Sequence, residues 1–104
     1  MAQMNLEQML TNSAQAARLL KAVANERRLV ILCYLLENEL SVTEMNEKLG
    51  LSQSALSQHL AVLRRQKLVK TRRDAQTVYY RLHSHEAQAL IGLLDSLYGG
   101  QRPT

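Results

Sequence analysis

The sequence predicts one mainly α-helical domain of the α+β class, with a small β-hairpin toward its C-terminal end. Three observations support this prediction. Apolar residues recur at helical spacing along most of the chain, the pattern changes to a period of two between residues 68 and 82, and 104 residues suffice for a single core. We therefore expect about five helices and a two-stranded hairpin in one domain that covers residues 1–104.

The first two helices are predicted from their apolar residues. Residues 6–23 carry one apolar stripe that includes Leu10 and Leu20, and a second stripe makes the apolar face wider than one packing contact needs. Asn25 is a suitable cap for the second helix, which is apolar nearly all round and which we expect at the buried centre of the domain. Residues 29–36 could in isolation form a buried strand, but the cap and the leucine spacing favour a helix.

Residues 41–66 have the pattern of a helix-turn-helix. Ser41 and Glu44 have the spacing of a capping box, in which a hydroxyl caps the helix and a glutamate lies three residues later. The short helix that they open ends at Gly50, a residue that readily takes the left-handed conformation of helix ends. Ser52 caps the next helix, which extends to about residue 66. Two short helices joined through a glycine turn are typical of helix-turn-helix motifs.

Residues 68–82 predict the hairpin. The strands are expected at residues 68–72 and 77–82, with residues 73–76 as a four-residue loop, although the loop lacks the Asn-Gly or Asp-Gly pair that favours tight hairpins. Four cations make this hairpin basic: Lys70, Arg72, Arg73 and Arg81. A basic hairpin directly after a helix-turn-helix can act as a wing that straddles the DNA backbone or enters the minor groove.

The last helix is predicted from residue 84 to residue 98, and two glycines end it before a flexible tail, residues 99–104. This helix carries a long apolar stripe, and residues 6–23 carry a second one. The core of so short a chain is too small to cover both stripes. We therefore expect these two terminal helices to form a homodimer, although both stripes could instead close the core of a monomer. The expected interface residues are Leu10, Leu20, Leu90, Leu94, Leu97 and Tyr98.

Positive charge is concentrated in one segment. The whole chain has 13 Lys and Arg residues against 9 Asp and Glu residues, for a formal net charge of +4. From residue 64 to residue 81, however, seven basic residues stand against Asp74 alone. Such a segment is typical of a protein that binds a polyanion, and the alternative is a basic face that only contacts solvent.

The helix at residues 53–65 has the side chains of a DNA recognition helix. Three leucines share one side of its helical wheel, while the opposite side is small and polar at its N-terminal end and basic at its C-terminal end. Short hydroxyl and amide side chains can enter the major groove and hydrogen-bond base edges. His59, at the edge of the leucine stripe, is expected to pack there with a satisfied hydrogen bond. The side chains that we expect at bases are Gln53, Ser54, Ser57 and Gln58, and those at phosphates are Arg64, Arg65, Lys70, Arg72 and Arg73.

These residues resemble the ArsR/SmtB family of winged helix-turn-helix repressors. The resemblance covers about residues 13–98 and is carried by residues 22–29, 51–60 and 78–80, with Arg64. Residues 24–28, 52–60 and 75–78 are similar to the HlyU branch of that family, which is related to the BigR-type persulfide and redox sensors. The family implies a homodimer of the first and last helices on an imperfect inverted repeat in promoter DNA. It also implies base contacts from Gln53, Ser54, Ser57 and Gln58, and backbone contacts from the wing around Arg72, Arg73 and Gln76; we also expect Thr43 at the backbone.

The sensor residues of that family are mostly missing here. Residues 40–45 lack the cysteines of its helix-3 metal site, and His83 and His85 do not reproduce the spacing of its last-helix site, so we expect no metal and no cofactor. In the redox-sensing relatives a cysteine at the position of Cys33 pairs with one at the position that is Gly99 in this chain. We therefore expect Cys33 to be a packed, inert side chain, with a lone-thiol redox sensor as the alternative.

The sequence thus predicts a sequence-specific, double-stranded DNA-binding transcriptional regulator. It contains no nucleophile elbow, phosphate-binding glycine loop or metalloprotease helix, so we expect no enzyme. The alternatives are a metal- or thiol-responsive repressor that uses Cys33 or His83 and His85, and a basic interaction module without sequence specificity. The longest apolar run has eight residues and the single cysteine cannot form an intrachain disulfide, so we expect a cytoplasmic protein without a membrane partner.

Overall fold

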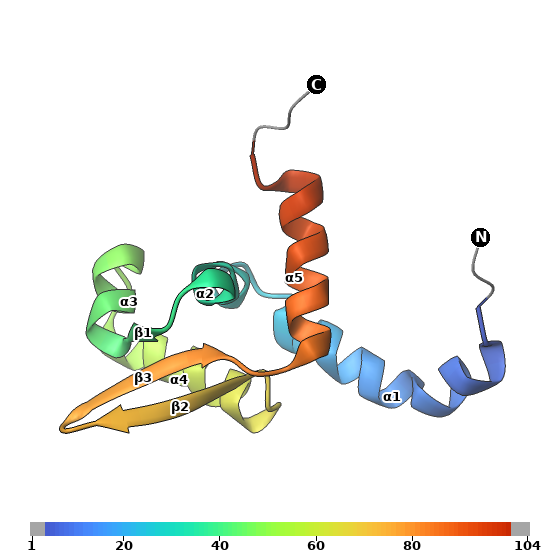
Figure 1. Ribbon diagram of the computed structural model, residues 1–104, viewed down its shortest axis with the longest axis horizontal. Coiled ribbons are helices and arrows are strands. Elements are labelled where there is room, and N and C mark those ends of the chain that lie inside the picture. Colours follow the sequence, from blue (N-terminus) through green and yellow to red (C-terminus); the bar gives the residue numbers. More distant parts are fainter. Residues whose placement is uncertain (1–3, 101–104) are drawn as a thin grey trace.

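The computed structural model describes residues 4–100, which form five α-helices and a three-stranded antiparallel sheet (Figure 1). In chain order these elements are α1 (Leu6–Val23), α2 (Glu26–Glu37), β1 (Leu40–Ser41), α3 (Val42–Leu49), α4 (Gln53–Arg65), β2 (Val69–Asp74), β3 (Thr77–Leu82) and α5 (His85–Tyr98). The predicted fold class is confirmed, with one strand more than expected. Of the predicted flexible tail, residues 101–104 lie outside the described residues.

The helix ends are held by the side chains that the sequence indicated. Asn25 accepts a hydrogen bond from the backbone N–H of Arg28 at 3.1 Å, and Ser52 caps α4 by accepting one from Ala55 at 3.2 Å. Ser41 and Glu44 form the complete capping box at the start of α3. Gly50 ends α3 with a φ of 67°, the left-handed conformation that only glycine adopts without strain. These local contacts set the lengths of α3 and α4 and the turn between them.

The sheet joins the start of α3 to the hairpin. Its strand order is β1-β3-β2, and β1 pairs with β3 through Leu40 opposite Tyr80. The expected four-residue loop was wrong, because the ladder continues to the pair Asp74–Thr77 and leaves a loop of two residues. Ala75 makes this tighter turn possible by taking a φ of 56°. The sequence gives little indication of that turn, since such a φ is uncommon for a residue with a Cβ.

The core lies between α2, α3, α4, the sheet and the first half of α5. Its fully buried large side chains are Ile31, Leu32, Met45, Leu56, Leu63 and Ile91. Helix α2 lies at the centre of the domain, as expected, because it packs against the four other helices and β3. One side of α2 packs into the core, whereas Val30 and Cys33 on another side are exposed.

The two terminal helices extend beyond this core. Figure 1 shows the N-terminal part of α1 and the C-terminal part of α5 pointing away from the other elements. Of the 18 residues of α1, only Ala22 and Val23 are buried. No helix in residues 4–100 is long and apolar enough to cross a membrane.

Candidate nucleic-acid interface

Helix α4 presents a polar face to solvent because its leucines hold the opposite face against the core. Leu56, Leu60 and Leu63 are at most 2% exposed. The side chains on the outward face are all exposed, as the helical wheel predicted; they are Gln53, Ser54, Ser57, Gln58, Arg64 and Arg65. This face is therefore available to a partner along its whole length.

The electrostatics of α4 favour an anionic partner at both ends. Its first turn carries no acidic residue, so the partial positive charge of the helix N-terminus is not neutralised there. The Ser52 hydroxyl caps the helix and also lies 3.4 Å from the Ser54 hydroxyl. At the other end, Arg64 and Arg65 lie in the last turn. The N-terminal half of the helix can thus approach a polyanion without an acidic side chain to repel it, and the two arginines at the other end can bind phosphates.

The end of α4 is held by a conformation that is uncommon for its residue. Lys67 has a φ of 61°, a position where glycine is usual. Its N–H bonds to the Arg64 carbonyl and the Leu68 N–H bonds to the Leu63 carbonyl, each at 2.9 Å, which is the paired arrangement of a Schellman motif. This tight ending leads α4 directly into β2, so the wing begins beside the basic end of the helix.

The hairpin separates its cations onto two faces. Val69, Tyr80 and Leu82 turn toward the core, and strand alternation therefore places Lys70 and Arg81 on the outer face, directly opposite one another. Like charges in opposite positions destabilise a strand pair. Neither forms an ion pair with any residue between 4 and 100. An external anion would relieve this repulsion.

The other wing residues lie nearer the tip. Arg73 is exposed and pairs with Val78, so it lies on the opposite face of the ribbon from Lys70. Gln76 is exposed in the two-residue loop, and Thr43 is exposed in the first turn of α3. The wing thus offers polar and basic side chains on both faces and at its tip.

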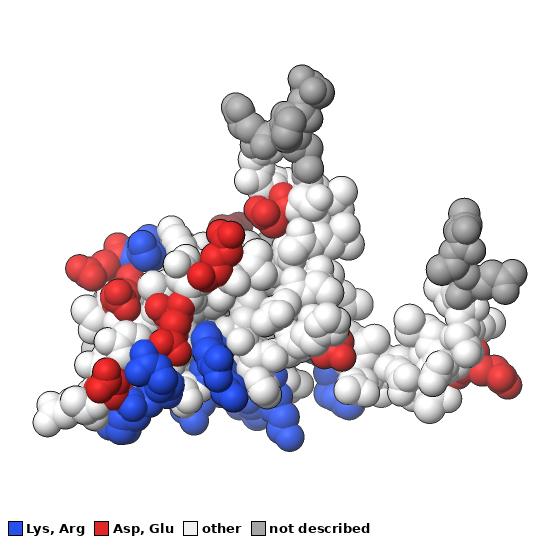
Figure 2. Space-filling model, in the orientation of Figure 1, with Lys and Arg blue, Asp and Glu red and all other residues white. Residues whose placement is uncertain are grey.

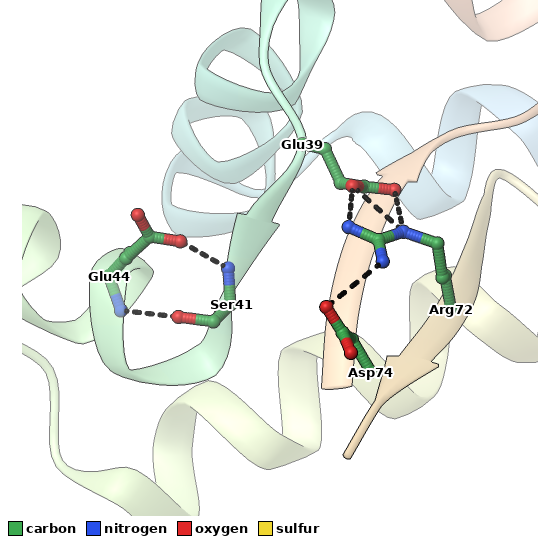
Figure 3. A network of polar contacts seen from close by, with 5 residues as sticks. All are labelled: Glu39, Ser41, Glu44, Arg72 and Asp74. Carbon is green, nitrogen blue, oxygen red and sulfur yellow. Dashed lines mark hydrogen bonds and ion pairs between the residues drawn. The ribbon is translucent and has the colours of Figure 1, made fainter. Parts of the chain in front are cut away.

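Arg72 is the exception among the wing cations, because it already has an acidic partner (Figure 3). Its Nη2 donates to Glu39 Oε1 at 2.6 Å, and its Nε lies 3.1 and 3.2 Å from the two carboxylate oxygens. These hydrogen bonds lower the pKa of Glu39 and raise that of Arg72. Glu39 is not predictable from a local pattern as the partner of Arg72, since the two residues are 33 positions apart.

The surface charge follows this arrangement. Figure 2 shows most of the visible Lys and Arg gathered in the lower part of the molecule, over the wing strands and α4 of Figure 1, with most Asp and Glu above them. The segregation gives the protein one basic side formed by the recognition helix and the wing. A long polyanion can contact both elements at once.

His59 differs from the expectation for it. The side chain is half-buried at the edge of the leucine stripe, but its buried Nδ1 has no hydrogen-bond partner in the described structure, so the predicted satisfied hydrogen bond was wrong. Desolvation lowers the pKa of His59, and the nearby guanidinium groups of Arg28 and Arg27 lower it further. Both effects favour the neutral form of this imidazole, which lies near the start of α2.

Cys33 also differs from its expected environment. It is exposed in the protomer rather than packed, because the helical wheel shows which residues share a side but not how far neighbouring elements cover them. Partial burial raises the pKa of the Cys33 thiol, and the carboxylate of Asp95 on α5 raises it further. His83 and His85 are exposed at the start of α5. Residues 4–100 contain no group of three or more His, Cys, Asp or Glu side chains placed to hold a metal ion.

Comparison with known proteins agrees with this geometry. The model of the bacterial regulatory protein, arsR family, matches residues 25–71. The transcriptional activator HlyU of Vibrio cholerae is 65% identical over 97 residues, which are 93% of this chain and 90% of that protein. The earlier resemblance to the ArsR/SmtB family and its HlyU branch is thereby confirmed.

Two solved structures extend the agreement to the fold. The transcriptional repressor BigR of Xylella fastidiosa has a TM-score of 0.86 at 37% identity and covers 94% of this chain and all of its own. A homodimeric winged helix-turn-helix DNA-binding domain from Mycobacterium bovis has a TM-score of 0.72 at 29% identity, covering 99% of this chain and 98% of that one. HlyU is thus described as a transcriptional activator and BigR as a transcriptional repressor. This chain, with its capped helix-turn-helix and basic wing, belongs to the ArsR family of bacterial regulatory proteins.

Proposed function

We propose that this protein is a transcriptional regulator that binds one double-stranded DNA sequence in preference to others. The observation that carries the proposal is the exposed polar face of α4, which lies beside a wing where the cations Lys70 and Arg81 stand opposite one another without an ion-pair partner in the described residues. Two adjacent cations without acidic partners are unfavourable in the free protein. The phosphates of a DNA backbone would neutralise them. A regulator of bacterial promoters acts in the cytoplasm, where the chromosome lies.

The proposed contacts divide into two groups. The base-reading side chains are Gln53, Ser54, Ser57 and Gln58, because amide and hydroxyl groups hydrogen-bond base edges in the major groove. Side chains that contact the backbone fix the register without reading sequence. This second group consists of Thr43, Arg64, Arg65, Lys70, Arg73 and Gln76. For Arg72, the pairing with Glu39 supports a positioning role instead of a phosphate contact.

We further propose that the protein works as a homodimer on an inverted repeat. Leu10, Leu20, Leu97 and Tyr98 are between 56% and 83% exposed in one protomer, and they lie on the two helices that extend beyond the core. Leu90 and Leu94 are partly buried on the same helix, α5. A second copy would cover these side chains and place two recognition helices about 34 Å apart, one turn of DNA. The homodimeric relative from Mycobacterium bovis supports this arrangement.

The test begins with a pool of random duplexes, from which the protein selects its preferred sequence. Affinity for that operator is then compared with affinity for a scrambled duplex over a range of salt concentrations. Gln53→Ala is expected to lower the preference for the operator by about 1–3 kcal/mol, while Gln88→Ala, an exposed glutamine on α5, leaves it unchanged. A parent protein that binds every duplex equally, with only a steep salt dependence, would contradict the proposal and indicate a basic module without sequence specificity.

The metal- or thiol-responsive alternative is not favoured. His83 and His85 lack a third metal ligand in the described part of the chain, and the raised pKa of Cys33 keeps its thiol in the less reactive protonated form. Operator binding that is equally insensitive to peroxide in the parent and in Cys33→Ser would remove the thiol sensor. If peroxide abolishes operator binding in the parent but not in Cys33→Ser, the thiol sensor is supported instead.

A further inference from the structure

The ion pair between Glu39 and Arg72 connects parts of the molecule that the sheet does not join directly. Glu39 immediately precedes β1, and Arg72 lies in β2, on the other side of β3. Because the strand order is β1-β3-β2, the two side chains meet across the middle strand. Figure 3 shows the pair beside the capping box of α3, whose cap residue Ser41 lies two residues after Glu39. The pair therefore bridges the start of the helix-turn-helix and the wing.

The geometry of this bridge restricts movement. Two nitrogen atoms of Arg72, Nε and Nη2, bond to the Glu39 carboxylate, with the shortest distance 2.6 Å. The guanidinium carbon lies 4.6 Å from the centre of the Tyr79 ring, and Nη1 lies 3.9 Å from Asp74. A planar group held by two hydrogen bonds and an aromatic face has fewer accessible orientations than a single ion pair. The half-exposed side chain of Arg72 thus contacts residues on both sides of it.

The sheet alone gives little support at this position. Strand β1 has only two residues, and its pairing with β3 is limited to Leu40–Tyr80 and Ser41–Tyr79. So short a ladder is a weak constraint on the angle between the wing and the helices that follow β1. The side-chain bridge supplies a second attachment outside the ladder.

Charge matching separates Arg72 from the other wing cations. Lys70, Arg73 and Arg81 have no ion-pair partner in the described region, whereas Arg72 has two. Moving Arg72 to a phosphate would leave the Glu39 carboxylate unpaired beside a polyanion, which is unfavourable. We propose that Glu39 and Arg72 form a positioning pair that stays closed on DNA and holds the wing at the angle where wing and α4 contact the same duplex. This inference rests on the proposed DNA-binding function.

The first experiment compares Glu39→Gln, Arg72→Gln and the double variant on the selected operator and on the scrambled duplex. If the pair positions the wing, each variant lowers the ratio of operator to scrambled affinity by about tenfold, and the double variant loses no more than the single ones. The double variant also keeps the salt dependence of the parent, because the closed pair has no net charge. Arg73→Gln is the matched control, and it is expected to weaken all duplexes and to reduce the salt slope by about one unit.

A change in the salt dependence of the double variant would contradict the positioning role. A salt slope that falls by about one unit in the double variant would show that Arg72 neutralises a phosphate, and it would overturn the positioning role. A parent that shows no operator preference would instead overturn the proposed function, so the two failures are distinguishable.

A second experiment needs no variant that changes the complex. The Nε–H resonance of Arg72 is assigned by NMR through its loss in Arg72→Gln, and is then followed in the free parent and in the operator complex. A positioning pair predicts slow solvent exchange and nearly the same chemical shift in both states. A large shift on binding DNA, with faster exchange, would show that the pair opens. In the free protein, Glu39→Gln is expected to speed hydrogen exchange at the amide of Ser41, which a surface ion pair without a positioning role would leave unchanged.

Discussion

The helix-turn-helix and the terminal helices of this protein use their apolar residues in opposite ways. Helix α4, with 13 residues, buries three leucines almost completely, whereas α1, with 18 residues, buries only Ala22 and Val23. On α5 the same contrast occurs within one helix, since Ile91 is fully buried and Leu97 is 59% exposed. The DNA-facing part is therefore complete within one chain. The terminal helices leave apolar side chains exposed in the protomer. In the proposed homodimer a second copy covers them, so their stability is expected to depend on protein concentration.

The largest expected effect comes from a charge placed on the terminal helices. Leu97→Asp would put a carboxylate into the proposed dimer interface without touching the core of the protomer. Burying an unpaired charge there costs about 3–5 kcal/mol, so the dissociation constant of the dimer is expected to rise by roughly a thousandfold. Analytical ultracentrifugation measures the change, with Leu97→Ala as a milder control. A variant that sediments as the parent does would show that α5 does not form the interface.

The core of the helix-turn-helix is the next most sensitive region. In the Leu97→Asp background, Leu63→Ala is expected to lower the free energy of unfolding by about 2–5 kcal/mol, because Leu63 is fully buried in the protomer. Leu10→Ala in the same background is the control, and it should change the free energy by less than about 0.5 kcal/mol. Urea denaturation measures both. If both variants lower the free energy of unfolding equally, the core of the helix-turn-helix and the exposed part of α1 would not differ as described.

A smaller effect is expected where the two halves meet. Arg28 on α2 holds the end of α1, since its Nε donates to the Ala22 carbonyl at 2.7 Å and its Nη2 donates to the Lys21 carbonyl at 3.3 Å. Arg28→Ala should lower the free energy of unfolding by about 1.5–3 kcal/mol, the usual contribution of hydrogen bonds to a charged group. Hydrogen exchange should become faster in the last turn of α1 before it does in α4. Arg27→Ala, at an exposed neighbouring position, is expected to leave both measurements unchanged.

The smallest expected effect is a gain at the tip of the wing. Ala75 has a φ of 56°, which is strained for alanine and not for glycine. Ala75→Gly should therefore raise the free energy of unfolding by about 0.5–1 kcal/mol, after allowance for the greater freedom of glycine in the unfolded chain. Gln76→Gly is the matched control, because Gln76 does not have a positive φ, and it should lower stability. Thermal denaturation of both variants decides the sign.

The fold was predictable from the sequence where the contacts are local. Asn25, Ser41 and Ser52 each cap a helix by binding an N–H three residues later, and such spacing is visible in the sequence. Strand β1 was not predictable, because two residues show no alternation and their partners lie far along the chain. The two-residue loop could not be predicted because it requires a positive φ at Ala75, which is uncommon for a residue with a Cβ.

In the candidate site, too, features that depend on local geometry were predictable and those that depend on distant contacts were not. The outward face of α4 follows from helical geometry, so the exposure of Gln53 and Ser57 could be predicted. The pairing of Arg72 with Glu39 depends on strand order, which no local pattern encodes. The exposure of Cys33 and the missing hydrogen bond of His59 depend on how closely other elements approach α2 and α4.

The short link between β3 and α5 limits how this protein can change in evolution. Only His83 and Ser84 separate the two elements; the His83 N–H bonds to the Leu68 carbonyl at 2.9 Å, and Ser84 caps α5. A residue inserted within the first turn of α5 would rotate the rest of the helix by about 100° and turn its apolar side away from a partner. The exposed tip at Ala75 and Gln76 has no such restriction. Natural variation in length should therefore accumulate at the wing tip and be nearly absent from the corner that leads into α5.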